Sequence, residues 1–335
     1  MRGFNRFWAF ALMGLWLCCM NVAQAAGPEI AMDGLKIVTA SAVQMRAAPV
    51  TTAPVVTRLK LGVTMRATRR TQQEEQIGNM RGYWYFVTGE GASGWVFGQF
   101  LRDFVPEKQD AIWIGLAKER ATNKNLKFAD YADTYGFISS VLPKAKDKSM
   151  GVELAFNRLI VLQRSVNLIT FENAKTQPYK RWLEMRQGEV FHDEISGQWL
   201  VPATAFWKLA DQVPNSPLGD EISRFAASAP LGGECEGDIS CNLARSLMTE
   251  GEYLKRYPNG RFAAAALKEA GEVLAFIQKE LASQPNYFRD FPDDSNGKVL
   301  QDYQAIVGNS RAAGVAQVMG QLRAIDARYR ATTRR

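Results

Sequence analysis

Histidine is almost absent from this chain of 335 residues, in which His192 is the single one. Zinc amidases and metallopeptidases need two or three histidine ligands at fixed spacing, so the composition argues against a metal site. No Gly-x-Ser-x-Gly motif occurs, which removes the usual signature of a serine hydrolase. Asp193 and Glu194 follow His192, but adjacent residues of a strand point to opposite faces and do not form one acid–base site. The sequence therefore predicts no catalytic residue of these classes, no metal and no cofactor.

Cysteine is scarce as well, with four residues in the chain. Cys18 and Cys19 lie in an apolar segment near the start, and Cys235 and Cys241 are the two that remain. Two cysteines in an exported chain usually pair, so we expect a Cys235–Cys241 disulfide. A cysteine peptidase would need one of them as a free thiolate beside His192, which this pairing opposes.

Long apolar runs are missing beyond the first 25 residues. Within residues 1–25, two arginines precede a short apolar run at 7–20, and Ala-Gln-Ala ends at Ala25. This order predicts a signal peptide cleaved before Ala26, with an uncleaved anchor as the alternative. Bulky residues ahead of Cys18 argue against a lipoprotein. We expect a periplasmic or otherwise exported protein that is soluble, without a transmembrane segment, after cleavage.

Strong charge of one sign is also lacking. Without Arg2 and Arg6 the net charge falls from +7 to +5, and both signs are mixed along the chain. A nucleic-acid-binding protein usually carries a concentrated basic patch, so no nucleic-acid partner is predicted.

Short strand-like runs separated by Gly and Pro begin at Ala40. Val55–Leu59, Tyr83–Val87 and Gly94–Phe97 are rich in β-branched and aromatic residues, and turns with glycine separate them. Short strands at such spacing predict a small β-barrel. The charged stretch from Arg66 to Gly82 is interpreted as a long loop.

The order of motifs in this segment resembles the bacterial SH3 family. The family pattern has Asn and Gly where this chain has Gln44 and Ala48, and its closing Gly-Trp-Val motif is the most specific part. The matching residues are Arg46, Pro49, Lys60, Gly62, Trp84-Tyr85, Gly94-Trp95-Val96 and Phe100-Leu101.

The resemblance implies a module that binds cell-wall peptides, or proline-rich or extended peptides of a protein partner, on aromatic side chains in a shallow groove. The ligand-binding residues that we expect are Tyr83, Tyr85, Trp95 and Phe97. The alternative is that alternate members of this aromatic set simply fill the core of the barrel.

The remainder of the chain has helical periodicity, which gives an α+β multidomain protein with a small SH3-like β-barrel followed by a mainly α-helical region. We expect the SH3-like domain at 36–105, a mainly helical domain at 106–232 with a hairpin near 189–201, and a helical hairpin region at 233–335. Residues 123–136 are polar and predict turns. Helices are predicted at 108–121, 150–171, 179–186, 202–213, 218–229, 242–257, 261–282 and 299–329.

The segment Tyr253–Ala263 looks like the inter-helix junction of periplasmic tetratricopeptide-like helical hairpins. It occurs once, so an ordinary helical hairpin explains it as well. An exposed apolar stripe on Val299–Tyr329 would indicate a dimerisation protein.

The favoured hypothesis is a non-catalytic envelope protein whose SH3-like module binds peptidoglycan peptide or a partner peptide, with the helical region as a scaffold. The alternative is a peptidoglycan-cleaving glycosidase of the lytic transglycosylase type, which needs one buried glutamate as general acid. Glu153, within an apolar helix, is the candidate for that role. It lacks the Glu-Ser signature of that class, and a solvent-facing or ion-paired Glu153 is the simpler interpretation.

Overall fold

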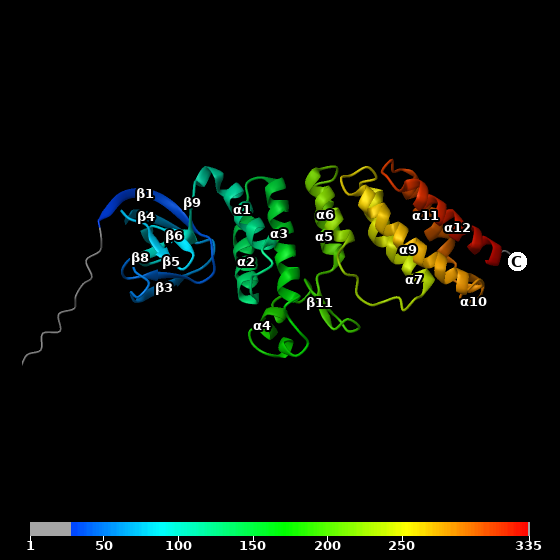
Figure 1. Cartoon of the computed structure of the whole chain (residues 1–335), viewed down its shortest axis with the longest axis horizontal. Helices are drawn as coiled ribbons and strands as arrows, with labels where there is room; N and C mark the ends of the chain where they lie inside the picture. The colour runs from blue at the N-terminus through cyan, green and yellow to red at the C-terminus, as the bar shows by residue number, and fades with distance from the viewer. Residues whose placement is uncertain (1–27, 334–335) are drawn as a thin grey trace, which may run out of the picture.

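The computed structural model describes residues 28–333, so the predicted signal peptide at 1–25 lies outside the described residues. An antiparallel β module comes first and a mostly helical region follows, which confirms the predicted α+β class. Along the long axis the β module comes first, the helices α1 to α6 follow, and the helices α7 to α12 come last (Figure 1). No helix among the described residues is long and apolar enough to cross a membrane.

The β module is built on a seven-stranded sheet in the order β3-β2-β8-β7-β4-β1-β9. All its pairings are antiparallel. The first strand of the sheet, β1, begins before Ala40, where the strand-like sequence pattern starts. It pairs with β4 on one side, where Ile37 lies opposite Thr64, and with β9 on the other, where Lys36 lies opposite Asp103. The strands are β1 (Glu29–Val38), β2 (Val43–Arg46), β3 (Val55–Leu59), β4 (Thr64–Thr71), β7 (Trp84–Gly89), β8 (Ala92–Phe97) and β9 (Leu101–Asp103).

Alternation along the strands gives the sheet two different faces. One face forms the core of the module, where side chains from six strands are almost completely buried. The other face of β7 and β8 carries the aromatic residues Trp84, Phe86, Trp95 and Phe97. Since successive side chains of a strand point to opposite faces, Tyr85 and Val87 belong to the core side.

The predicted loop at 66–82 is wrong. β4 continues to Thr71, and β5 (Glu75–Ile77) and β6 (Met80–Gly82) form a small hairpin. The charges do not break β4, because Arg66 and Arg69 meet carboxylates of β1. Arg66 lies 2.5 Å from Asp33, and Arg69 lies 3.3 Å from Glu29.

The first part of the helical region packs α1, α2 and α3 against one another and then adds α5 and α6. A single apolar core runs through it and takes in Ile37 and Leu61 of the β module. A two-stranded hairpin occupies the region near 189–201. The elements are α1 (Gln109–Thr122), α2 (Phe128–Val141), α3 (Lys148–Val166), α4 (Tyr179–Glu184), β10 (Phe191–Asp193), β11 (Gln198–Leu200), α5 (Ala203–Ala210) and α6 (Pro217–Ala227).

The expectation of turns over 123–136 is wrong for most of that stretch, because α2 begins at Phe128. Its start is capped by Asp130, whose carboxylate accepts the backbone N–H of Lys127 at 3.2 Å. Phe128, Tyr131, Tyr135 and Ile138 recur at helical spacing and are all buried. This apolar stripe outweighs the turn-forming polar residues on the other face.

A second apolar core extends from Ala227 to Ile325. A short π-helical turn, Leu247–Gly251, separates α7 from α8. The helices are α7 (Ile239–Ser246), α8 (Glu252–Arg256), α9 (Ala263–Ser283), α10 (Tyr287–Asp290), α11 (Ser295–Gly308) and α12 (Val315–Thr333).

The single helix predicted at 299–329 is wrong, since the chain breaks between α11 and α12. Gly314 has a φ of +101°, and the backbone N–H of Arg311 donates to the side chain of Asn259 at 2.7 Å. The bend folds the two helices onto each other. It buries the apolar side chains that would have formed an exposed dimerisation stripe: Leu300, Tyr303, Val307, Val318, Leu322 and Ile325.

Candidate functional site

A pocket of about 300 Å³ opens on the aromatic face of the β module. Its floor consists of the rings of Trp84, Phe97 and Phe100. Trp84 and Phe97 face each other across β7 and β8 in a T-shaped contact with ring centres 5.5 Å apart. Phe97 makes a second such contact with Phe100 at 6.3 Å. Edge-to-face packing of this kind fixes the rings and leaves an ordered apolar surface.

The β5–β6 hairpin completes the pocket. Ile77 and Met80 line it, and the Glu75 carboxylate accepts a hydrogen bond from the indole N–H of Trp84. A buried indole N–H needs such a partner, so Glu75 holds Trp84 in place while the hairpin covers the aromatic face. Because residues 66–82 were interpreted as a loop, the roles of Glu75, Ile77 and Met80 in the pocket were not predicted from the sequence.

Polar groups form the rim of the pocket. Ser41, Gln44 and Thr51 lie there beside Arg46, whose guanidinium donates to the carbonyl of Ala53 at 2.6 Å. Within residues 28–333 the charge of Arg46 has no carboxylate partner. An arginine with spare N–H groups at the edge of an aromatic floor suits a ligand with a carboxylate or a row of carbonyl oxygens.

The structure separates the four residues that the sequence singled out. Phe97 lines the pocket, and Trp95 lies beside it on the same face, buried against Phe86 at a ring distance of 5.5 Å. Tyr83 and Tyr85 point the other way. The guanidinium of Arg70 covers the first at 4.0 Å, and the ammonium of Lys36 covers the second at 4.5 Å.

Comparison with known proteins bears on this part of the chain. A family model described as a bacterial SH3 domain matches residues 41–102. This segment is a bacterial SH3 domain. Such domains are typical of cell-envelope proteins and commonly bind peptidoglycan. No curated protein and no solved structure matches the chain.

The SH3 domain is fixed to the helical region at the same end as its pocket. Arg120 of α1 is buried and donates to the hydroxyl of Ser41, a rim residue, at 3.1 Å. Thr134 of α2 accepts from the Arg120 Nε at 3.2 Å, which orients the guanidinium. The helical region therefore supports one wall of the pocket.

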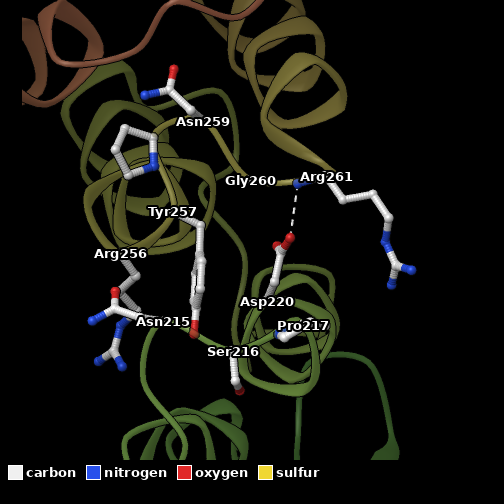
Figure 2. Close-up of a pocket in the computed structure, with 10 residues that line it drawn as sticks. Asn215, Ser216, Pro217, Asp220, Arg256, Tyr257, Asn259, Gly260 and Arg261 are labelled. Atoms are coloured by element: carbon white, nitrogen blue, oxygen red, sulfur yellow. Dashed lines mark hydrogen bonds between the residues drawn. The ribbon is translucent and has the colours of Figure 1, made fainter.

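A wider cavity of about 620 Å³ lies between the start of α6 and the turn that joins α8 to α9 (Figure 2). Asp220 links the two sides. One of its oxygens accepts the Tyr253 hydroxyl at 2.5 Å and the other accepts the backbone N–H of Arg261 at 2.8 Å. The Arg261 side chain lies 3.6 Å from Glu221, and Arg256 is paired with Asp211 and Glu252. Because its charged groups are already satisfied, this cavity has the character of a structural joint.

The candidate glutamate of the glycosidase hypothesis is not deeply buried. The side chain of Glu153 is 32% exposed and lies 3.9 Å from the ammonium of Lys118. A general acid of that class lies in a buried, apolar environment, whereas Glu153 is partly exposed beside a cation.

His192 and the cysteines have structural surroundings. His192 packs against Trp199 across the β10–β11 hairpin, with the rings tilted by 54° and their centres 5.1 Å apart. Cys235 and Cys241 form the expected disulfide, with Cα atoms 5.5 Å apart. Within residues 28–333, no group of three or more His, Cys, Asp or Glu side chains is arranged to hold a metal ion.

Proposed function

We propose that this protein is a non-catalytic component of the cell envelope that binds wall peptides through its SH3 domain. The pocket floored by Trp84, Phe97 and Phe100 is the binding site, and the helical region presents it. The observation that carries the proposal is the combination of an ordered aromatic floor with the guanidinium of Arg46 at its rim, which donates to Ala53 and Gln44 but has no carboxylate partner among residues 28–333.

The chemistry of wall peptides fits this combination. They are short and extended and carry free carboxylates. An aromatic floor takes up an extended chain at low entropic cost, and an arginine at the edge selects for a negative group. Residues 36–105 contain nine Lys or Arg and four Asp or Glu, a net charge of +5, which supports attraction to an anionic wall.

The helical region serves as a scaffold in this proposal. Its first core is shared with the SH3 domain through Ile37 and Leu61, so the domain is carried as a rigid part. The helical hairpin from α8 to α9 offers a further surface of the tetratricopeptide type for an envelope partner.

A test uses the chain from Ala26 to Arg335 and isolated peptidoglycan sacculi. Thr51 is exposed and lines the pocket, while its exposed neighbour Thr52 does not. In Thr51→Trp a large ring enters the pocket, and Thr52→Trp is the matched control. Co-sedimentation should be strong for the original chain and for Thr52→Trp. It should fall about tenfold for Thr51→Trp, because the added ring keeps the wall peptide from at least one of its contacts with the aromatic floor.

The same incubations report on the glycosidase alternative through release of soluble muropeptides. We expect no release, and the same result for Glu153→Gln. Release that Glu153→Gln abolishes would replace the proposal with the enzymatic function. Equal sedimentation of the two tryptophan variants would show that the wall is bound elsewhere on the protein.

A further inference from the structure

Another cavity, of about 510 Å³, lies where α3 ends beside β11. It is far from the SH3 pocket in sequence, and none of its lining residues has a role in the function proposed above. Figure 1 places α3 and β11 side by side in the middle of the molecule. Its volume is in the range typical of small-molecule sites.

One wall of this cavity is aromatic. Phe171 and Trp199 line it, and His192 lies between them, with ring centres 6.1 Å from Phe171 and 5.1 Å from Trp199. Phe171 is 54% exposed, which is unusual for a ring of this size. The indole N–H of Trp199 and Nε2 of His192 are buried without a hydrogen-bond partner among residues 28–333. An exposed ring, Phe171, beside a second aromatic side chain, Trp199, suits the apolar face of an amphipathic ligand.

The side-chain amides of Asn167 and Gln198 line another part of the cavity, and Gln163 fixes the orientation of the Asn167 amide. Gln163 accepts the backbone N–H of Val201 through Oε1 at 3.0 Å, so its Nε2 must donate to Asn167 Oδ1, which lies at 2.6 Å. The Nδ2 group of Asn167 is thereby left as a donor for the cavity. Gln198 lines the cavity as well and is exposed.

A negative charge lines the cavity, and a positive charge lies beside one of its rings. Glu172 lines the cavity, and a hydrogen bond from the Thr170 hydroxyl lowers the pKa of its carboxyl. The ammonium of Lys175 lies 4.4 Å from the ring centre of Phe171. One carboxylate and one ammonium favour a ligand without net charge, which distinguishes this cavity from the cationic rim of the SH3 pocket.

We propose that this cavity binds a neutral sugar ring, and that its ligand is an N-acetylated sugar of the wall glycan. A sugar ring has an apolar face of C–H groups that stacks on aromatic side chains. Its edge carries hydroxyl and amide groups that match Asn167, Gln198 and Glu172. The assignment to wall glycan rests on the proposed function: the SH3 domain would bind the peptide while this cavity binds the strand that bears it. Two weak sites on one body then act together.

The test measures binding of tetra-N-acetylchitotetraose, a peptide-free oligosaccharide, to the chain from Ala26 to Arg335 by calorimetry. Phe171→Ala removes an exposed ring, and Asn167→Asp replaces the donor by an acceptor. Each should weaken binding about tenfold, the loss of one stacking or hydrogen-bonding contact. Phe291→Ala is the matched control, because Phe291 is 59% exposed and lies outside the cavity. Thermal melting of every variant verifies that it is folded.

Loss in Phe171→Ala and Asn167→Asp, with full binding by Phe291→Ala and Thr51→Trp, would establish the sugar site. No binding of the oligosaccharide, or equal binding by all variants, would overturn it. Loss in Thr51→Trp alone would move the sugar to the SH3 pocket and also overturn it. Sugar binding that needs Phe171, in a protein that does not sediment with sacculi, would leave the sugar site standing but remove both the proposed function and the assignment of the ligand to wall glycan.

Discussion

Gly62 lies directly against the ring of Phe137, so closely that a Cβ at this position would overlap the ring carbons. Gly62 belongs to the turn before β4, and Phe137 belongs to α2. The contact therefore joins the SH3 domain to the helical region. The backbone of Gly62 has a φ of +81°, so the turn and the close approach both require glycine here.

Replacing Gly62 by alanine should destabilise the protein by about 2–4 kcal/mol, because backbone strain adds to overlap with a buried ring. Gly91→Ala is the control: its φ of +77° is nearly the same, but no atom lies within 4 Å of the added Cβ. Denaturant unfolding of both variants measures the difference. Equal losses would mean that strain alone matters and that the contact with Phe137 adds nothing.

The acidic side chain of Glu250 should make stability depend on pH. It lies in the π-helical turn, where burial raises the pKa of its carboxyl although Thr249 and Ser246 donate to it at 2.6 and 3.2 Å. The folded protein therefore holds this proton more tightly than the unfolded chain does. The stability from this group is complete below the ordinary carboxyl pKa, and it is lost as the pH rises through the raised value.

The variant Glu250→Gln should remove that loss, since a neutral amide of the same shape does not ionise. We expect a higher melting temperature than the original protein at pH 7 and little difference at pH 4, measured by calorimetry at both values. A variant that is less stable at pH 7 would show that the carboxylate is needed for its hydrogen bonds.

The joint between the two apolar cores depends on Asp220. Its carboxylate is 8% exposed and accepts hydrogen bonds from Tyr253 and from the backbone of Arg261. Asp220→Ala should cost about 3 kcal/mol, because two donors lose a charged acceptor. Asp211→Ala, which breaks an ion pair whose carboxylate is 58% exposed, should cost less than about 1 kcal/mol. Urea unfolding compares the two variants, and similar losses in the free energy of unfolding would contradict the role of Asp220 in joining the two cores.

The disulfide should make a modest contribution to the free energy of unfolding. The loop between Cys235 and Cys241 is short, and the chain-entropy model gives about 2.4 kcal/mol for it. The double variant Cys235→Ser with Cys241→Ser should lose about that amount under oxidising conditions. The original protein treated with a reductant should match it. A variant that does not fold at all would mean that the disulfide has a larger role than closing its own loop.

The sequence predicted those parts of the fold in which local pattern and final structure agree. Local sequence pattern alone was enough to predict the strands near Val55–Leu59 and Gly94–Phe97 and the order of a β module before a helical region. β1 was missed because its segment contains Asp33 and Gly34, which disfavour strands locally. Pairing with β4, whose arginines meet the β1 carboxylates, decides its conformation.

The candidate site was predicted only in part, because local alternation assigns a residue to a face of the sheet but does not show which distant segments cover that face. Phe97 does line the pocket, whereas Trp84, which was not among the expected ligand-binding residues, forms its floor while remaining buried. Period-two alternation places Tyr85 on the opposite face from both. Ile77 and Met80 reach the pocket through a hairpin, and strong charge in the flanking sequence concealed that hairpin.

Ile37 and Val38 are neighbours in β1, yet each belongs to a different core: Ile37 to the helical region and Val38 to the SH3 domain. The segment that matches the family, residues 41–102, contains neither. Excised at those limits, the domain would leave β4 with a bare edge that invites aggregation. The smallest autonomous folding unit therefore begins before the family match and extends into the helices, and unfolding of the two parts should be a single cooperative event.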